Sequence, residues 1–160
     1  MANKKYPLKD ILRIRKIKLD AALAELQKQK IRLNKHIKKV EKQKWRIQEF
    51  AKWLPQEEDK LFKKIIKQNV KKDAVEDIKA RMEGHRTRQK EHDERLKKLE
   101  EEQKQIEKDL ETARVAMQNI SSDLEKISQH KETWIKAYDK EQEDLLEKET
   151  EDLKKKNPLF

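Results

Sequence analysis

The chain contains no cysteine, only one glycine and three prolines, and only 5% of its 160 residues are aromatic. The absence of cysteine excludes disulfides and thiolate metal sites. Folds built from strands and tight turns use more glycine and proline than this chain has. No apolar run approaches the roughly 20 residues of a membrane span, and residues 1–10 show no apolar signal-peptide core. These absences favour a helical protein without a membrane segment, which we expect in the cytoplasm.

Charged residues, in contrast, are abundant. They make up 46% of the chain, and their balance gives a formal net charge of +10. High charge with low hydrophobicity is typical of disordered chains, but also of long helices whose apolar residues repeat with a period near 3.5. The spacing of the apolar residues therefore decides between disorder and a long helix.

A seven-residue repeat runs through the first half of the chain. Every seventh residue from Leu12 to Met82 is apolar, with the exception of Gln68. The column is Leu12, Leu19, Leu26, Leu33, Val40, Ile47, Leu54, Leu61, Gln68, Val75 and Met82. Such a repeat keeps one stripe of a helix against a partner helix along its length. Each buried leucine contributes roughly 1.5–3 kcal/mol, so the column favours a packed helix over a disordered chain.

A second repeat follows the single glycine, Gly84. One of its columns is Leu96, Gln103, Leu110, Met117, Leu124, Lys131, Tyr138 and Leu145, and the other is Leu99, Ile106, Ala113, Ile120, Ile127 and Trp134. Glycine just past a helix end accepts the left-handed conformation that closes the helix, and Thr87 is a suitable N-cap for the next helix. The sequence therefore predicts an all-α fold, namely a long antiparallel two-helix coiled-coil hairpin.

The predicted hairpin is a single domain over residues 1–160. Its first arm covers about residues 6–83, its turn about residues 84–87 and its second arm about residues 88–155. The companion column of the first arm is predicted four residues after each core site. It is Lys16, Leu23, Lys30, Ile37, Lys44, Ala51, Glu58 and Ile65.

Pro55 lies within the first predicted arm. A proline inside a helix removes a hydrogen bond and costs about 3 kcal/mol or more, so it could end one helix and open another. The seven-residue column nevertheless keeps its phase from Leu54 to Leu61. We therefore expect a continuous arm with a kink near Pro55.

Charge is divided unequally along the chain. Residues 1–84 carry a net charge of +13, and residues 85–160 carry −3. A hairpin folded at Gly84 would set Arg13 to Lys18 near Glu141 to Glu147, and opposite charges across a coiled coil set its pairing. The excess positive charge should attract an acidic surface of a protein or a nucleic acid.

Several large apolar residues fall outside the predicted seam. Ile17, Ile31, Trp45 and Ile66 share a seven-spaced column, and Phe50, Trp53 and Phe62 lie on either side of Pro55. Two interpretations remain open for them. They widen the buried face or pack around the proline, or they form an exposed docking stripe for a partner.

The sequence shows no pattern that catalysis or cofactor binding requires. One glycine cannot form a phosphate-binding loop, and no serine lies on a strained strand-to-helix turn. His85 and His92 are seven residues apart, whereas helical metal pairs are three or four apart. We expect no enzyme activity, no cofactor and no metal.

The start of the chain resembles a known family. Tyr6-Pro7-Leu8-Lys9-Asp10-Ile11-Leu12-Arg13-Ile14-Arg15-Lys16, followed by Asp20-Ala21-Ala22-Leu23-Ala24-Glu25-Leu26, is similar to the opening of the YscO/FliJ proteins, and most similar to the chlamydial member. These are coiled-coil stalk proteins of type III secretion and flagellar export. The resemblance implies a hairpin similar to the γ subunit of rotary ATPases, peripheral to the export apparatus at the inner membrane.

The same resemblance implies particular partners. They are a hexameric secretion ATPase, an export gate protein and export chaperones, with no small-molecule substrate. It places the basic start of the first arm near the ATPase ring and Gly84 to Arg88 at the distal tip. The residues expected to bind partners are Arg13, Arg15, Lys16, Lys18, Ile31, Trp45, Trp53, His85, Arg86 and Arg88.

Two other functions are compatible with the residues alone. The basic first arm could bind nucleic acid, although it lacks an aromatic stacking pattern. Alternatively, two chains could form a parallel coiled-coil homodimer that serves as a scaffold.

Overall fold

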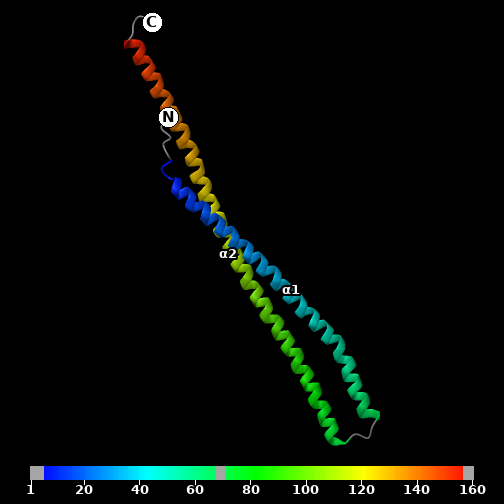
Figure 1. Cartoon of the computed structure of the whole chain (residues 1–160). Coiled ribbons are helices and arrows are strands. Elements are labelled where there is room, and N and C mark those ends of the chain that lie inside the picture. Colours follow the sequence, from blue (N-terminus) through cyan, green and yellow to red (C-terminus); the bar gives the residue numbers. More distant parts are fainter. Residues whose placement is uncertain (1–5, 68–70, 157–160) are drawn as a thin grey trace. The chain divides into compact units, whose positions relative to one another are not determined.

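The computed structural model describes residues 6–67 and 71–156. Within these ranges the chain forms two α-helices, α1 (Lys9–Lys67) and α2 (Lys72–Lys156), which pack against each other as a hairpin without strands (Figure 1). The prediction of an all-α, antiparallel two-helix coiled-coil hairpin is confirmed. Neither helix contains a stretch apolar enough to cross a membrane in the part of the chain that is described.

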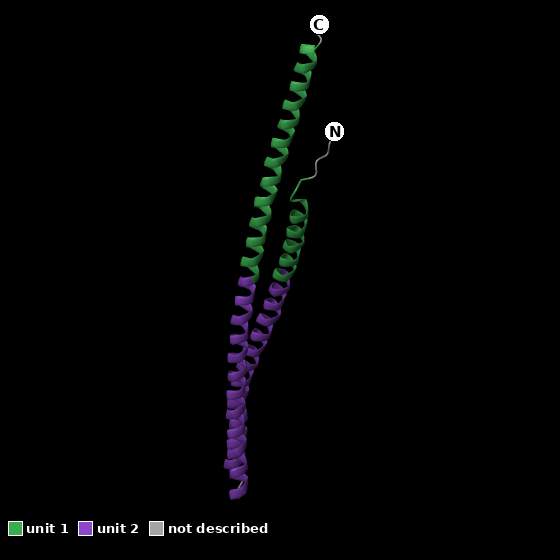
Figure 2. Cartoon of the chain, turned by 90° about the vertical axis from the view of Figure 1, so that its left-hand side faces the viewer, with its two compact units in different colours: residues 1–26, 113–160 green, residues 27–112 purple. Residues whose placement is uncertain are grey.

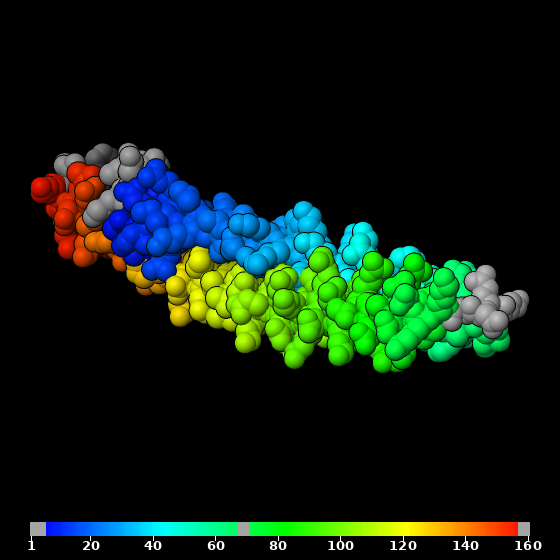
Figure 3. Space-filling model, turned by 90° about the horizontal axis from the view of Figure 1, so that it is seen from below, coloured from blue at the N-terminus to red at the C-terminus, as the bar shows by residue number. Residues whose placement is uncertain are grey.

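Contacts within the hairpin group the chain into two compact units (Figure 2). Unit 1 consists of residues 1–26 and 113–160, and unit 2 consists of residues 27–112. Each unit therefore pairs one segment of α1 with one segment of α2. In unit 2 the two segments lie along each other, as the cyan and green surfaces show (Figure 3). The single domain over residues 1–160 stays a prediction.

The predicted turn at residues 84–87 is wrong. Helix α2 runs through Gly84 without interruption, and one helix gives way to the next between Lys67 and Lys72. Gly84 does not have a positive φ. Thr87 is not an N-cap, because its hydroxyl donates to the backbone carbonyl of Glu83 at 3.0 Å, as threonines inside helices do. The predicted bounds of both arms are wrong for the same reason.

The seven-residue column explains why α2 continues past its glycine. Val75 and Met82 belong to α2, and the column proceeds in the same phase to Leu96. Both side chains are half-buried, and the burial of this stripe outweighs the roughly 1 kcal/mol that a glycine costs inside a helix. Gln68, the polar member of the column, lies outside the described residues, between the end of α1 and the start of α2.

Replacing Gly84 by alanine is expected to stabilise the protein by about 0.5–1 kcal/mol. A Cβ atom added at Gly84 would have no heavy atom within 4 Å, and the backbone there is already helical. The free energy of unfolding in urea, followed by circular dichroism, measures the effect. Ala80→Gly, at another exposed position of α2, is the matched control and should cost a similar amount. A destabilised Gly84→Ala protein would indicate a turn at this glycine in solution.

Helix α1 buries its leucine column as predicted. The second column that it buries is not the predicted companion column. The least exposed members of the leucine column are Leu12, Leu26, Val40 and Leu61. The predicted companion column, four residues later, is wrong, since Leu23 is 45% exposed. The buried companions lie three residues after the leucines instead. They are Gln29, His36 and Gln43, which we call the polar column.

Helix α1 is continuous through Pro55, as the phase of the repeat predicted. The kink near Pro55 stays a prediction. Helix α2 buries the two predicted columns as far as Tyr138, with Ile106 and Ala113 most enclosed and the other members half-buried. The prediction is wrong for the last member, Leu145, which is 47% exposed. Beyond them, residues 139–156 of α2 are exposed throughout. We call residues 139–156 the C-terminal extension of α2.

Candidate partner-binding surfaces

In unit 1, an aromatic cluster fixes the chain segment that precedes α1 against α2. Tyr6 is buried, and its hydroxyl hydrogen-bonds to Nδ1 of His130. The Tyr6 ring meets the Trp134 ring edge to face at 5.5 Å between centroids, and Trp134 stacks on Tyr138 at 5.3 Å. Such pairs contribute about 0.5–1.5 kcal/mol each beyond area burial. The start of α1 is therefore held in place, which fixes the basic residues that follow.

The basic start of α1 lies on the surface of unit 1. Arg13, Lys16 and Lys18 are exposed. Arg15 is half-buried, and its guanidinium contacts the Asp123 carboxylate at 3.0 Å. The predicted pairing of this segment with Glu141 to Glu147 is wrong, because the reversal lies before Lys72 rather than at Gly84, and this moves the register along α2.

Apolar side chains accompany these cations. Ile11, Ile14 and Ile17 are 42%, 48% and 61% exposed. The start of α1 also borders a surface hollow of about 460 Å³, which none of these isoleucines lines. It is lined by Tyr6, Pro7, Lys9, Asp10, Leu12, Arg13, Lys16 and Lys131. We call Ile11, Arg13, Ile14, Lys16, Ile17 and Lys18 the α1 start surface. Exposed isoleucines between cations are a combination suited to a protein partner with an acidic rim and an apolar centre.

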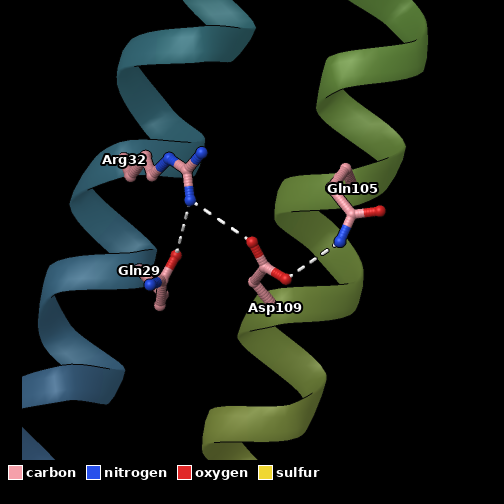
Figure 4. Close-up of polar contacts among 4 residues, drawn as sticks. All are labelled: Gln29, Arg32, Gln105 and Asp109. Atoms are coloured by element: carbon pink, nitrogen blue, oxygen red, sulfur yellow. Dashed lines mark hydrogen bonds and ion pairs between the residues drawn. The ribbon is translucent and has the colours of Figure 1, made fainter.

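In unit 2, an ion pair joins the two helices near the surface. The Arg32 guanidinium donates to the Asp109 carboxylate at 3.3 Å and to Oε1 of Gln29 at 3.5 Å (Figure 4). Nε2 of Gln105 donates to the other oxygen of Asp109 at 3.1 Å. Exposed ion pairs of this kind contribute only about 0–1 kcal/mol to folding stability. Their main effect is therefore on the alignment of α1 with α2.

The polar column makes the buried contacts between the helices of unit 2. His36 Nε2 donates to the backbone carbonyl of Leu99 at 2.6 Å. Gln43 Nε2 donates to the backbone carbonyl of His92 at 3.0 Å. Oε1 of Gln43 has no partner among the described residues. The sequence analysis missed this column, although the seven-residue spacing of Gln29, His36 and Gln43 was the signal that could have revealed it.

A second aromatic cluster brings together two of the predicted site residues. The rings of Trp53 and His85 meet at nearly right angles, 5.1 Å apart between centroids. Phe50 lies 5.5 Å from Trp53 and 5.4 Å from His92. His85 therefore packs between α1 and α2 in unit 2, and the expectation that Gly84 to Arg88 form the tip of the hairpin is wrong, because they lie inside α2.

The remaining predicted site residues do not join a cluster. Ile31 and Trp45 are exposed on α1, with Trp45 60% exposed. Arg86 and Arg88 are exposed on α2. The exposed Trp45 agrees with the docking interpretation of the off-seam column, whereas Phe50 and Trp53 agree with packing near Pro55. No group of three or more metal-ligating side chains is placed to hold a metal ion within residues 6–67 and 71–156.

The sequence profile of the type III secretion protein YscO matches residues 8–156. The chain belongs to the YscO family of type III secretion proteins. This confirms the resemblance seen at the start of the sequence. Among curated proteins, none matches the chain significantly.

Two solved structures share the fold of this YscO-family chain. The type III secretion protein YscO from Vibrio parahaemolyticus is 22% identical, with a TM-score of 0.82 over 91% of each chain. A YscO homologue from Chlamydia trachomatis is 24% identical, with a TM-score of 0.78 over 95% of this chain and 93% of that one. Both similarities extend over nearly the whole hairpin, so this chain and the two solved structures share the two-helix fold along most of their length.

Proposed function

We propose that this YscO-family protein is a non-enzymatic stalk and adaptor of a type III secretion export ATPase. It would promote assembly and turnover of the hexameric ATPase, much as the γ subunit acts in rotary ATPases, and would also bind the export gate protein and export chaperones. The ATPase would supply all nucleotide chemistry. The protein would work in the cytoplasm, peripheral to the export apparatus at the inner membrane.

The observation that carries this proposal is the α1 start surface. It combines Arg13, Lys16 and Lys18 with three exposed isoleucines on a segment that the Tyr6 cluster holds in place. Helix α1 as a whole carries 19 Lys and Arg against 8 Asp and Glu, whereas α2 carries 20 against 24. The attraction for an acidic partner is therefore concentrated on α1.

The structure does not favour the homodimeric scaffold. A parallel dimer would need the leucine column of α1 as its interface, but Leu12, Leu26, Val40 and Leu61 are already buried within one chain. The surfaces left for partners are the charged and off-seam residues.

Charge reversal at the α1 start surface is expected to weaken ATPase stimulation. Arg13→Glu combined with Lys16→Glu should raise the half-maximal concentration for stimulating the cognate ATPase about tenfold, which corresponds to about 1.4 kcal/mol of lost binding. The steady-state rate of ATP hydrolysis and the hexamer fraction in light scattering measure the effect. Lys97→Glu with Lys104→Glu makes the same charge change on α2 and should leave stimulation unchanged. If the wild-type chain neither stimulates the ATPase nor copurifies with it, the proposal fails.

A further inference from the structure

A second strongly charged surface lies in unit 2, apart from the α1 start surface. A hollow of about 430 Å³ opens between α1 and α2 there. It is lined by Lys39, Lys42, Gln43, Arg46, Arg95, Lys98, Leu99 and Glu102, which we call the basic groove. Five of these side chains are cations and one is a carboxylate. Glu102 lies 3.9 Å from Nε2 of His36.

The cations of the basic groove are not neutralised by the protein itself. Lys39, Lys42 and Arg46 of α1, and Arg95 and Lys98 of α2, form no ion pair with any residue of the described ranges. By contrast, Arg15 and Arg32 each contact an aspartate on α2. Five unpaired cations around one hollow produce a positive potential that a single carboxylate cannot cancel, so the groove attracts an anionic ligand.

Beyond the basic groove, the positive surface continues at the end nearer Lys35, whereas carboxylates accompany the cations at the other end. One adjoining hollow shares Lys39 and Glu102 and adds Arg32 and Lys35. Another shares Arg95 and Lys98 and adds Arg88, together with the carboxylates of Glu91 and Glu94. From Arg32 to Arg46 the helix rises about 21 Å, which matches about six residues of extended peptide. A single phosphate or carboxylate would occupy only a small part of this strip.

We propose that the basic groove binds an extended, acidic segment of a partner protein, about six residues long and rich in Asp and Glu. Bidentate pairing suits Arg46 and Arg95 to side-chain carboxylates.

The composition of the groove favours peptide over nucleic acid. Single-stranded nucleic acid is held by aromatic side chains on which its bases stack, and the groove lining includes no Trp, Tyr or Phe. This inference concerns unit 2 and does not depend on the proposed action on an ATPase.

Binding of a fluorescein-labelled peptide of six alternating Asp and Glu residues, followed by fluorescence anisotropy near physiological ionic strength, tests the proposal. The triple variant Lys42→Gln, Arg46→Gln, Lys98→Gln should weaken peptide binding at least tenfold. The control Lys97→Gln, Lys104→Gln, Lys108→Gln removes the same charge from exposed positions of α2 outside the groove, and should change affinity less than twofold. Circular dichroism confirms that both variants stay folded.

Two further ligands make the outcome decisive. A peptide of six alternating Asn and Gln residues should not bind, and a single-stranded DNA oligonucleotide of equal charge should bind more weakly than the acidic peptide. Equal loss of binding in the two triple variants would overturn the proposal, because it would reflect net charge alone. Tighter binding of the oligonucleotide, lost only in the groove variant, would overturn it in favour of a nucleic-acid site. Failure of the wild-type chain to bind the acidic peptide would also overturn it.

Discussion

Replacing Leu61 by alanine is expected to lower the free energy of unfolding by about 2–5 kcal/mol. Leu61 is 2% exposed, which makes it the most enclosed apolar side chain in the described part of the chain. Its truncation removes buried methyl groups and leaves a cavity that two paired helices close only in part. Because folded proteins are stable by only about 5–15 kcal/mol, one such cavity removes a large share of the total.

Urea unfolding followed by circular dichroism measures this loss. The matched control is Phe62→Ala, the neighbouring residue, whose side chain is larger but 49% exposed. It should cost only about 1–1.5 kcal/mol, since half of its surface already contacts water. Equal losses in the two variants would mean that the seam of α1 does not pass through Leu61 in solution.

At Gln43, in the polar column, a substitution is expected to stabilise the protein rather than destabilise it. Gln43→Leu should raise the free energy of unfolding by about 1–2 kcal/mol, because a buried carbonyl without a hydrogen bond costs about 1–3 kcal/mol. Gln43 is 2% exposed and its Oε1 has no partner among the described residues. The substitution loses the hydrogen bond to the backbone carbonyl of His92, but it buries an apolar side chain in the same space.

Gln29→Leu is the matched control for this prediction. Gln29 belongs to the same polar column, but its Oε1 accepts a hydrogen bond from Arg32. Its replacement should therefore stabilise the hairpin less than that of Gln43, as denaturant midpoints will show. If Gln43→Leu destabilises the protein, the buried oxygen is satisfied in solution.

The polar column also determines how the helices of unit 2 align. A buried polar residue in a coiled coil specifies register at a cost in stability. His36 and Gln43 each donate to a backbone carbonyl of α2, at Leu99 and His92, which are seven residues apart. A shift of α2 by a few residues would break both hydrogen bonds together. We infer that the polar column fixes the register of the two helices, and that the unsatisfied oxygen of Gln43 is the cost in folding free energy.

The fold was predictable from the leucine column, but the position of the reversal was not. Phase continuity from Leu54 to Leu61 correctly indicated that α1 passes Pro55. The column also keeps its phase from Met82 to Leu96, with Gln89 at the site between them, and this is compatible with an unbroken helix through Gly84. The conformational freedom of glycine instead favoured a turn at Gly84. Gln68 interrupts the apolar column in the gap between α1 and α2, but Gln89 interrupts it inside α2, so a polar residue in the column does not by itself locate the reversal.

The buried companion column was predicted wrongly for a physical reason. Offsets of three and four both satisfy a two-stranded seam, and Leu23, Ile37 and Ile65 made the offset of four more apolar. The structure instead buries Gln29, His36 and Gln43. The hydrogen bonds of His36 and Gln43 to α2 exist only once the helices are paired, so residue hydrophobicity alone could not reveal this column. The basic groove was hidden similarly, since its cations come from positions more than 40 residues apart in the sequence.

The exposed C-terminal extension of α2 affects how a partner would bind to this end of the helix. Residues 139–156 are all exposed, including Leu146 and Leu153, so no described residue covers this helix. Helices in proteins draw most of their stability from tertiary packing, so we expect this segment to open more often than the seam beside Ile106. A partner that captures this segment must order it at the same time. Such coupled folding lowers affinity for a given contact area, which favours contacts that form and release repeatedly.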